Sequence, residues 1–295
     1  MSHVLTLIGN SDTELTQDHV DAVAAAIGTK SAPTWLKQNH ACDLPLEAAD
    51  TSTIDAARIA LKGAALDVVC QPVVHRRKKL LVADMDSTII EQECIDELAD
   101  ALGIRDAISE ITERAMRGEL EFEPALRERV GLLKGLAESE LQRVYETQIT
   151  ETPGGRMLCA TMRKHGGTCA LVSGGFTFFT ERVAKSVGFT SNQANTLLVE
   201  NGALTGEVSD PILGREAKVS ALKSLASDLK INALETMAVG DGANDLGMIG
   251  EAGLGVAFHA KPVVAAAAPA QINHGDLSAL LYIQGYRSDE IVNPA

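Results

Sequence analysis

The chain has 295 residues, a length typical of about two domains, and its 45% hydrophobic and 22% charged residues are an ordinary globular composition. A formal net charge of −14 argues against sequence-independent nucleic-acid binding, which depends on many Lys and Arg contacts with phosphates. No stretch approaches the length of a membrane-spanning apolar segment and the N-terminus lacks a leader pattern, so we expect a cytoplasmic protein with neither a nucleic-acid nor a membrane partner.

The first 74 residues predict a small α/β domain. Strand, helix, two strands, helix and strand follow one another in the split βαβ, or ferredoxin-like, order. This topology looks like the small amino-acid-sensing ACT fold, although no ligand-site signature accompanies it. The next stretch, HRRKKL at 75–80, predicts a basic, solvated linker. The expected elements are strands at 3–8, 33–38, 41–46 and 66–69 and helices at 16–27 and 53–65.

From residue 75 onward the sequence predicts a second domain, 75–295, of the α/β class. Three apolar runs each stop at a polar or Gly-rich signature, namely LLVADMDST, TCALVSGG and TMAVGDGAND. Short apolar strands that alternate with helical segments indicate a doubly wound parallel sheet. Ligands bind at the carboxyl ends of the strands in such sheets, so the three signatures can meet at one site.

Two further segments interrupt this pattern. Residues 95–151 are mostly helical in pattern and charged, and they are too long for an ordinary loop. We expect a helical cap that covers the strand ends, excludes water and contributes substrate contacts. Further on, Asn201-Gly202 between two extended runs is a strong hairpin signal.

The first signature places two acids, Asp84 and Asp86, one residue apart at the end of a strand. By itself the pair is a weak signal, because Asp is also common as a helix N-cap. In an extended segment, however, residues two apart point the same way and can reach one ligand. Two close carboxylates also shift each other's pKa unless a cation or a shared proton relieves the repulsion. Thr88 and the N–H groups behind the pair can contact an anion.

The other two signatures add groups suited to a phosphate and a metal ion. Ser173 to Gly175 offers a hydroxyl and exposed N–H groups with no side chain in the way of a phosphate. Lys218 opens a helical pattern and would by default be a solvated lysine. In GDGAND, the two glycines let the backbone approach a ligand, and Asp241 and Asp245 supply the hard oxygen ligands that Mg²⁺ prefers.

This order of signatures resembles the haloacid dehalogenase superfamily of phosphotransfer enzymes, from residue 80 to the C-terminal region. Within it, the closer resemblance is to the phosphoserine phosphatase family. The segments that carry this resemblance are DMDSTIIEQECIDELA, AMRGELEFEPALRERVGLL, VSGGF and AVGDGANDLGMI.

The resemblance implies a Mg²⁺-dependent reaction through an aspartyl-phosphate. Asp84 would be the nucleophile, and Asp86 the general acid and then the general base. The Asp84 carboxylate, the Asp86 backbone carbonyl and Asp241 would hold Mg²⁺. The remaining roles follow the family as well: Ser173, Gly174 and Lys218 would bind phosphoryl oxygens, and Asn244 and Asp245 would position the metal and the substrate.

The implied substrate is O-phospho-L-serine, hydrolysed to L-serine and phosphate in the last step of L-serine biosynthesis. Its ammonium and carboxylate need an acid and a base, and Glu93 and Arg129 match the family's residues in those roles. Arg can bind a carboxylate through two parallel hydrogen bonds. Phe122 and Met116 would close the apolar side of the pocket.

Two other functions stay open on the sequence. One is an enzyme that transfers the phosphoryl group to another alcohol or hydrolyses another small phosphate ester. The other is a receiver-like switch that is phosphorylated on Asp, which the second acid, Asp86, disfavours because it hastens loss of the phosphate. A homodimer and feedback by serine at residues 1–74 are open hypotheses.

Overall fold

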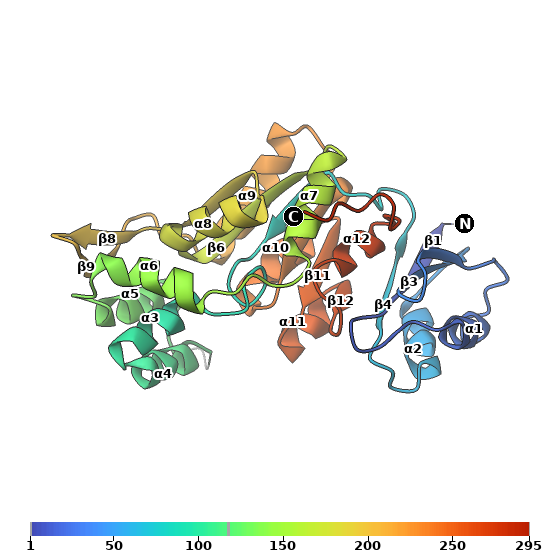
Figure 1. The fold of residues 1–295 in the computed structure, drawn as a ribbon, viewed down its shortest axis with the longest axis horizontal. Coiled ribbons are helices and arrows are strands. Elements are labelled where there is room, and N and C mark those ends of the chain that lie inside the picture. The colour runs from blue at the N-terminus through green and yellow to red at the C-terminus, as the bar shows by residue number, and fades with distance from the viewer. Residues whose placement is uncertain (1, 117–118, 295) are drawn as a thin grey trace.

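The computed structural model describes residues 2–116 and 119–294, with the side chain of Met116 outside the described part. The molecule has three parts in a row (Figure 1). An N-terminal unit lies at one end, a parallel sheet with its helices lies in the middle, and a lobe of helices with one hairpin, which we call the cap, lies at the other end.

The N-terminal unit confirms the ferredoxin-like expectation. Its four strands form an antiparallel sheet in the order β2-β3-β1-β4. The side chains of Thr16 and Asp50 accept backbone N–H groups at the starts of the two helices, which fixes where each helix begins. The elements are β1 (His3–Ile8), α1 (Gln17–Ala26), β2 (Thr34–Lys37), β3 (Ala41–Leu46), α2 (Thr51–Ala60) and β4 (Asp67–Pro72).

The basic stretch at 75–80 is only in part the solvated linker that the sequence predicts: Arg77 and Lys79 are exposed, whereas Arg76 and Lys78 are not. The Arg76 guanidinium donates to both carboxylate oxygens of Asp43, at 2.6 and 2.7 Å, and to the Ile283 carbonyl at 2.7 Å. Lys78 is only 6% exposed. The prediction is wrong for Arg76 and Lys78 because the stretch runs between the N-terminal unit and the C-terminal segment, and Arg76 binds both.

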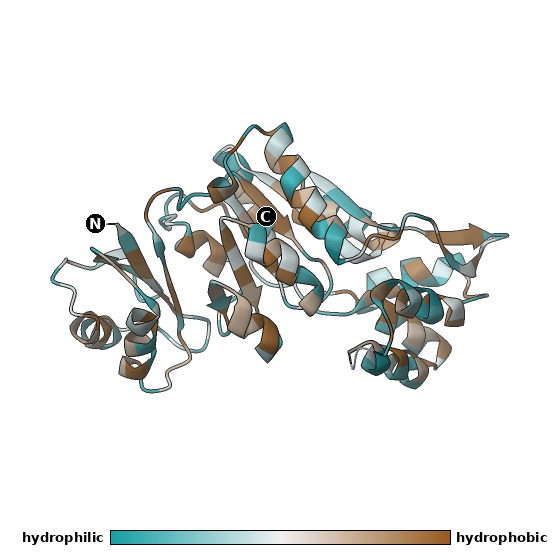
Figure 2. Cartoon of the chain, turned by 180° about the vertical axis from the view of Figure 1, so that it is seen from behind, coloured by the Kyte–Doolittle hydropathy of each residue, from teal (hydrophilic) through white to brown (hydrophobic). Residues whose placement is uncertain are grey.

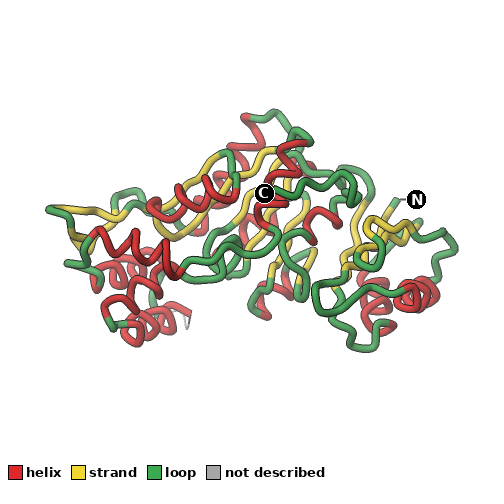
Figure 3. Tube along the Cα trace, viewed as in Figure 1, coloured by secondary structure: helices red, strands yellow, loops and turns green. Residues whose placement is uncertain are grey.

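The middle part is a six-stranded, all-parallel sheet in the order β12-β11-β10-β5-β6-β7. Helices α9 and α10 cover one face, and α7, α8 and α12 cover the other, so the sheet is doubly wound as predicted (Figure 3). The strands are β5 (Leu80–Ala83), β6 (Thr168–Phe176), β7 (Ser191–Asn195), β10 (Thr236–Gly240), β11 (Leu254–Phe258) and β12 (Ala270–Ile272); the helices are α7 (Gly155–Lys164), α8 (Thr177–Val187), α9 (Arg215–Asp228), α10 (Leu246–Glu251), α11 (Pro262–Ala267) and α12 (Ala279–Ile283).

Strand β5 shows why its sequence is a continuous apolar run. Leu80 and Val82 pack toward α9 and α10, while Leu81 and Ala83 pack into the larger core on the other face. All four residues are buried, because successive side chains point to opposite faces and helices cover both. The apolar central strands stand out in Figure 2.

The cap is built from two separate insertions. The first contains α3 (Cys94–Leu102), α4 (Arg105–Met116), α5 (Phe122–Leu132) and α6 (Glu138–Gln148), as the helical expectation for 95–151 requires. The second is the hairpin of β8 (Leu197–Glu200) and β9 (Ala203–Val208), which turns at Asn201-Gly202. Gly135 and Leu136 exchange backbone hydrogen bonds of 2.8 Å with Leu204, so the hairpin joins the helices. The sequence predicts the helical insertion and the hairpin as separate features, but not that the two pack into one cap.

Two chain segments lead into and out of the first insertion. They run antiparallel: the Glu91 N–H donates to the Thr150 carbonyl at 3.0 Å, and the Thr152 N–H donates to the Ile89 carbonyl at 2.9 Å. The entering segment starts directly behind Asp86, so the cap is joined to the sheet beside the predicted site. Among the helices of the described ranges, none combines the length and apolar character needed to cross a membrane.

Candidate active site

The three sequence signatures meet at one edge of the sheet, as predicted. Asp84 directly follows β5, Ser173 lies near the end of β6, and Asp241 directly follows β10. Strand β5 pairs with both β6 and β10, so these ends are neighbours. Strand β6 continues to Phe176, past the predicted end at Ser173, and its register with β7 becomes irregular there.

Lys218 is a buried lysine between two carboxylates. Its Nζ lies 2.7 Å from Oδ2 of Asp84 and 2.7 Å from Oδ1 of Asp245. Burial alone would lower the pKa of Lys218, but the two carboxylates outweigh it and raise that pKa above its usual value. Lys218 therefore brings a fixed positive charge to Asp84, placed by the first turn of α9.

Asp84, Asp241 and Asp245 form a compact acidic cluster whose potential ligand atoms all lie within 4.8 Å of one another. Burial, followed by the charge of Asp84, raises the pKa of Asp241 to about 6 and that of Asp245 to about 7. Oxygen donors in this arrangement suit a hard divalent cation, which would relieve the repulsion. The cluster therefore fits Mg²⁺, and it brings Asp84 together with both acids of GDGAND.

Asp86 has a different environment from Asp84. Its Oδ1 accepts the Cys94 N–H at 2.9 Å, and its Oδ2 accepts the Ser173 hydroxyl at 3.1 Å. Burial, and then the charge of Asp84, raises the pKa of Asp86. The two acids of the first signature are thus unequal: Asp84 is paired with a lysine, and Asp86 is favoured in its protonated form.

The GDGAND turn needs its two glycines for space. A Cβ atom on Gly240 would lie 2.3 Å from the Asp245 carboxylate, and one on Gly242 would lie 2.3 Å from Oδ1 of Asn244. The Gly242 N–H also donates to Oδ2 of Asp245 at 3.1 Å. The turn therefore holds Asn244 and Asp245 close to the backbone of the site. In addition, the Thr88 hydroxyl donates to Oδ1 of Asp241 at 3.3 Å, so here it supports an acid of the cluster.

The cap brings an acid, Glu93, and a base, Arg129, toward this edge. Glu93 is the N-cap of α3, and its Oε1 accepts the Ser87 hydroxyl at 2.8 Å. Part of its surface stays open to solvent, yet desolvation and then the charge of Asp86 raise the pKa of Glu93 to about 8. Arg129 on α5 is half-buried; burial lowers its pKa, and the charge of Glu93 opposes that effect.

Phe122, the first residue of α5, lies against two glycines of the sheet edge. A Cβ atom on Gly174 would lie 3.2 Å from its ring, and one on Gly214 would lie 3.1 Å away. We call Gly174 and Gly214 the glycine seat of Phe122. Met116 ends α4, but its side chain lies outside the described residues, so its predicted contact stays a prediction.

Asn195, which is not predicted as a site residue, lies at the end of β7 and is 2% exposed. Its Nδ2 donates to the Gly174 carbonyl at 2.8 Å. No local motif marks this residue, because its partners lie in segments far away in the sequence. It can be found only once β6 and β7 are placed side by side.

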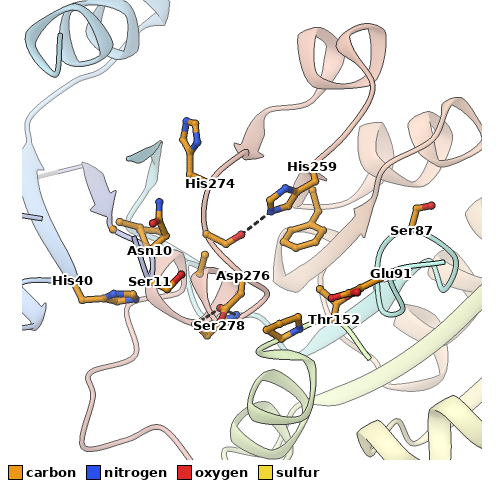
Figure 4. A pocket seen from close by; sticks show the side chains of 16 residues that line it. Asn10, Ser11, His40, Ser87, Glu91, Thr152, His259, His274, Asp276 and Ser278 are labelled. Carbon is orange, nitrogen blue, oxygen red and sulfur yellow. Dashed lines mark hydrogen bonds between the residues drawn. The ribbon is translucent and has the colours of Figure 1, made fainter. Parts of the chain in front are cut away.

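A cavity of about 590 Å³ lies between the N-terminal unit and the sheet (Figure 4). Ser87 and Glu91, which follow Asp86, form part of its wall, and His259 and His274 line it from the C-terminal segment. His259 Nε2 lies 2.8 Å from the Gly275 carbonyl. Asp84, Lys218 and Asp241 are not among the residues that line this cavity.

The chain matches the family model for haloacid dehalogenase-like hydrolases over residues 81–249. A phosphoserine phosphatase of Archaeoglobus fulgidus is 44% identical over 217 residues, which are 73% of this chain and 63% of that relative. A phosphoserine phosphatase of Streptomyces coelicolor is 41% identical over 236 residues, 80% of this chain and 57% of that relative. The chain thus spans somewhat more than half the length of these two proteins.

A solved structure matches nearly the whole chain, the N-terminal unit included. It is a probable phosphoserine phosphatase of Vibrio cholerae, with a TM-score of 0.79 and 33% sequence identity over 98% of this chain and 88% of that one. The family model covers the three strand-end signatures and the cap between them. The chain belongs to the haloacid dehalogenase-like hydrolase family.

Proposed function

We propose that this protein is a Mg²⁺-dependent phosphoserine phosphatase that releases L-serine and phosphate from O-phospho-L-serine. The observation that carries the proposal is the pairing of two unlike acids at one strand end: Asp84 beside Lys218, and Asp86 beside Ser173. Glu93 and Arg129 on the adjoining cap add the charges that an amino acid needs. The names of the similar proteins support the same substrate.

In the first half of the reaction, an Asp84 carboxylate oxygen attacks phosphorus. A bond forms between that oxygen and phosphorus, and the bond from phosphorus to the serine oxygen breaks. Asp86, with its raised pKa, gives its proton to the leaving serine oxygen. Lys218 and the N–H groups after Ser173 balance the negative charge on the phosphoryl oxygens.

In the second half, water attacks the phosphorus of the aspartyl-phosphate. Asp86, now ionised, takes the proton from that water, the bond from Asp84 oxygen to phosphorus breaks, and inorganic phosphate leaves. Asp84 returns as a carboxylate beside Lys218, and Asp86 is protonated again. The same carboxyl group therefore acts in both halves, first as acid and then as base.

We propose that Asp84, Asp241 and the Asp86 backbone carbonyl hold Mg²⁺, and that Asn244 and Asp245 position the metal and the substrate. When bound, Mg²⁺ supplies positive charge to the phosphoryl oxygens. Lys218 alone cannot neutralise three buried carboxylates and an incoming phosphate. An acidic protein can thereby accept an anionic ester through local positive charge.

The amino-acid part of the substrate points toward the cap in this proposal. The Arg129 guanidinium binds the substrate carboxylate through paired hydrogen bonds, and Glu93 binds its ammonium. An ammonium also lowers the pKa of Glu93 from its raised value, so binding ionises the acid that recognises it. Phe122 and Met116 close the apolar side.

Kinetics with O-phospho-L-serine and a panel of other phosphomonoesters, each with and without Mg²⁺, test the function. We expect the highest kcat/KM for O-phospho-L-serine and no turnover after chelation. Equal rates across the panel would contradict the substrate assignment. Transfer of phosphate to an added alcohol would favour a phosphotransferase, and a stable phosphoprotein without turnover would favour a switch.

Glu93→Ala and Arg129→Ala test substrate recognition separately from chemistry. We expect each to lower kcat/KM for O-phospho-L-serine by at least about tenfold, the value of one or two lost charged hydrogen bonds. Hydrolysis of p-nitrophenyl phosphate, which has neither ammonium nor carboxylate, should change far less. An equal loss on both esters would show that the two residues support the fold or the chemistry instead.

Three further assignments, of the domains, the cellular location and the assembly, complete the proposal. The chain divides into an N-terminal domain of residues 1–74, ACT-like in topology, and a phosphatase domain of residues 75–295 with its cap inserted at about 95–151. We place the protein in the cytoplasm, where its proposed substrate is soluble. A homodimer is the assembly to test first, by light scattering at micromolar concentrations.

A further inference from the structure

Asn195 joins three segments around the proposed phosphate end of the site. Its Nδ2 donates to the Gly174 carbonyl at 2.8 Å and to the Leu213 carbonyl at 3.2 Å. Its Oδ1 accepts the Leu213 N–H at 2.7 Å. One carboxamide thus ties together the Ser-Gly-Gly segment of β6, the end of β7 and the segment that leads into α9.

These hydrogen bonds hold both glycines of the Phe122 seat in place. Gly174 is bonded to Asn195 directly, and Gly214 follows Leu213, which Asn195 holds at both its N–H and its carbonyl. The two glycines come from segments about 40 positions apart in the chain. No hydrogen bond between backbone groups of these two segments is present in the described part of the chain, so the side chain bridges them.

The position of Asn195 also relates the seat to the cap. β7 ends at Asn195, and the cap hairpin begins two residues later at Leu197. After the hairpin, the chain returns through Leu213 to α9, which carries Lys218. Asn195 therefore links the segment that leaves the sheet for the cap hairpin to the segment that returns from the hairpin to α9.

We propose that Asn195 is a positioning residue for the reaction: it sets Gly174 against the phosphoryl group and holds Gly174 and Gly214 together as the surface on which the cap's Phe122 closes. This inference rests on the proposed function, because it assigns Gly174 to the phosphoryl group. A buried amide bonded only within β7 would have a structural role alone. Here every partner belongs to a segment that borders the site.

Asn195→Asp tests this role with almost no change in shape. The variant loses both donated bonds and keeps the acceptor for the Leu213 N–H. We expect kcat/KM for O-phospho-L-serine to fall about 10- to 100-fold, the range expected when a reacting group is misplaced by up to about 1 Å. The inhibition constant of inorganic phosphate should rise about tenfold, because the Gly174 segment binds it less well.

The matched control is Asn192→Ala on the same strand. The Asn192 amide oxygen accepts the Thr180 hydroxyl of α8 at 3.0 Å, and within the described chain no hydrogen bond joins the Asn192 side chain to Gly174, Leu213 or Gly214. We expect kcat/KM and phosphate inhibition within about twofold of the wild type, even if the melting temperature falls. Equal kinetic losses in the two variants would overturn the positioning role.

A double-mutant cycle with Phe122→Leu tests the seat itself. If Asn195 acts by holding the seat, Asn195→Asp should lower kcat/KM by a smaller factor in the Phe122→Leu background than in the wild type. If the two residues act independently, the two factors multiply, and that result would contradict the proposal. If Asn195→Asp folds poorly, Gly214→Ala perturbs the seat directly, because the added Cβ atom would lie 3.1 Å from the Phe122 ring. We then expect a raised KM with unchanged phosphate inhibition; an unchanged KM would contradict the proposal.

The same measurements separate this inference from the proposed function. If the wild-type protein does not hydrolyse O-phospho-L-serine, the proposed function fails. If the wild type is active and Asn195→Asp behaves like Asn192→Ala, only the role of Asn195 fails.

Discussion

Asp84 and Asp86 are chemically alike, and their surroundings make them different. Asp84 faces the buried ammonium of Lys218, while Asp86 accepts hydrogen bonds from Ser173 and from the Cys94 N–H. The raised pKa of Asp86 favours the form that can give up a proton, and the Lys218 ammonium lies 2.7 Å from the Asp84 carboxylate. This division can be tested with substrates that differ only in how much they need that proton.

We expect Asp86→Asn to slow hydrolysis of O-phospho-L-serine by about 10²- to 10⁴-fold, the usual contribution of a general acid or base. With p-nitrophenyl phosphate, whose leaving group needs no proton, the same variant should release a burst of about one nitrophenol per enzyme and then stall. Stopped-flow absorbance measures the burst. Asp84→Asn is the control and should give none; a burst in that variant would overturn the nucleophile assignment.

The acidic cluster predicts a pH-dependent response to Mg²⁺. Because the pKa values of Asp241 and Asp245 are raised to about 6 and about 7, the folded protein without metal retains protons that the unfolded chain releases near pH 4. The stability from these protons is present at low pH and is lost as pH rises through about 6 to 7. The metal replaces the protons.

We therefore expect the increase in melting temperature on adding Mg²⁺ to be small at pH 5 and larger at pH 8. Differential scanning fluorimetry at constant ionic strength measures it. Asp241→Asn should flatten the response. A Mg²⁺ effect of the same size at both pH values would mean that these carboxylates do not hold the ion.

At the scale of elements, the hairpin β8–β9 completes the cap, and two of its glycines separate backbone strain from packing. Gly202 and Gly206 both have positive φ, at 77° and 83°. A Cβ atom on Gly202 would meet nothing within 4 Å, whereas one on Gly206 would lie 2.9 Å from Cβ of Lys134. The two positions therefore form a matched pair.

Gly202→Ala should cost about 1–2 kcal/mol of unfolding free energy, the penalty of a left-handed conformation for a residue with a Cβ. Gly206→Ala should cost about 1–3 kcal/mol more, because the added carbon also pushes the hairpin away from α5. Urea denaturation measures both. Equal losses would show that the hairpin packs on the helices less closely than the structure has it.

The elements also show what the sequence could and could not reveal. Leu80–Ala83, buried on both faces, has the continuous apolar pattern of a central parallel strand, and the carboxyl-end rule then placed Asp84, Ser173 and Asp241 together. By contrast, Asn195 acts through Gly174 and Leu213, partners that no local pattern encodes. The linker error has the same origin: Arg76 looked solvated because its partner Asp43 and its carbonyl contacts lie far away in the chain.

At the scale of the whole molecule, Asp67 fastens the N-terminal unit to the sheet. This buried carboxylate accepts the N–H groups of Asn273 at 2.7 Å and of Gly275 at 2.7 Å, and it lies within 3.3 Å of the His274 N–H. Charged acceptors with several backbone donors make the stronger class of hydrogen bond. The N-terminal unit is thus held to the loop that also lines the cavity of Figure 4.

We expect Asp67→Asn to lower the free energy of unfolding by about 2 kcal/mol, because the neutral amide offers one acceptor oxygen and leaves buried N–H groups unpaired. The exposed Asp55→Asn on α2 should stay within about 0.5 kcal/mol of the wild type. Limited proteolysis should then cleave the Asp67 variant near residues 73–79. Resistance equal to that of the wild type would mean that other contacts hold the unit without Asp67.

The attachment of the N-terminal unit has a consequence for biosynthesis. All six of its elements lie within residues 3–72, yet the backbone groups of the sheet domain that Asp67 and Arg76 bind lie at 273–283. The unit can fold first, but the segment to which it docks is synthesised only after some two hundred further residues. During that interval the Asp67 carboxylate lacks the N–H partners that it has at 273–275 in the finished fold.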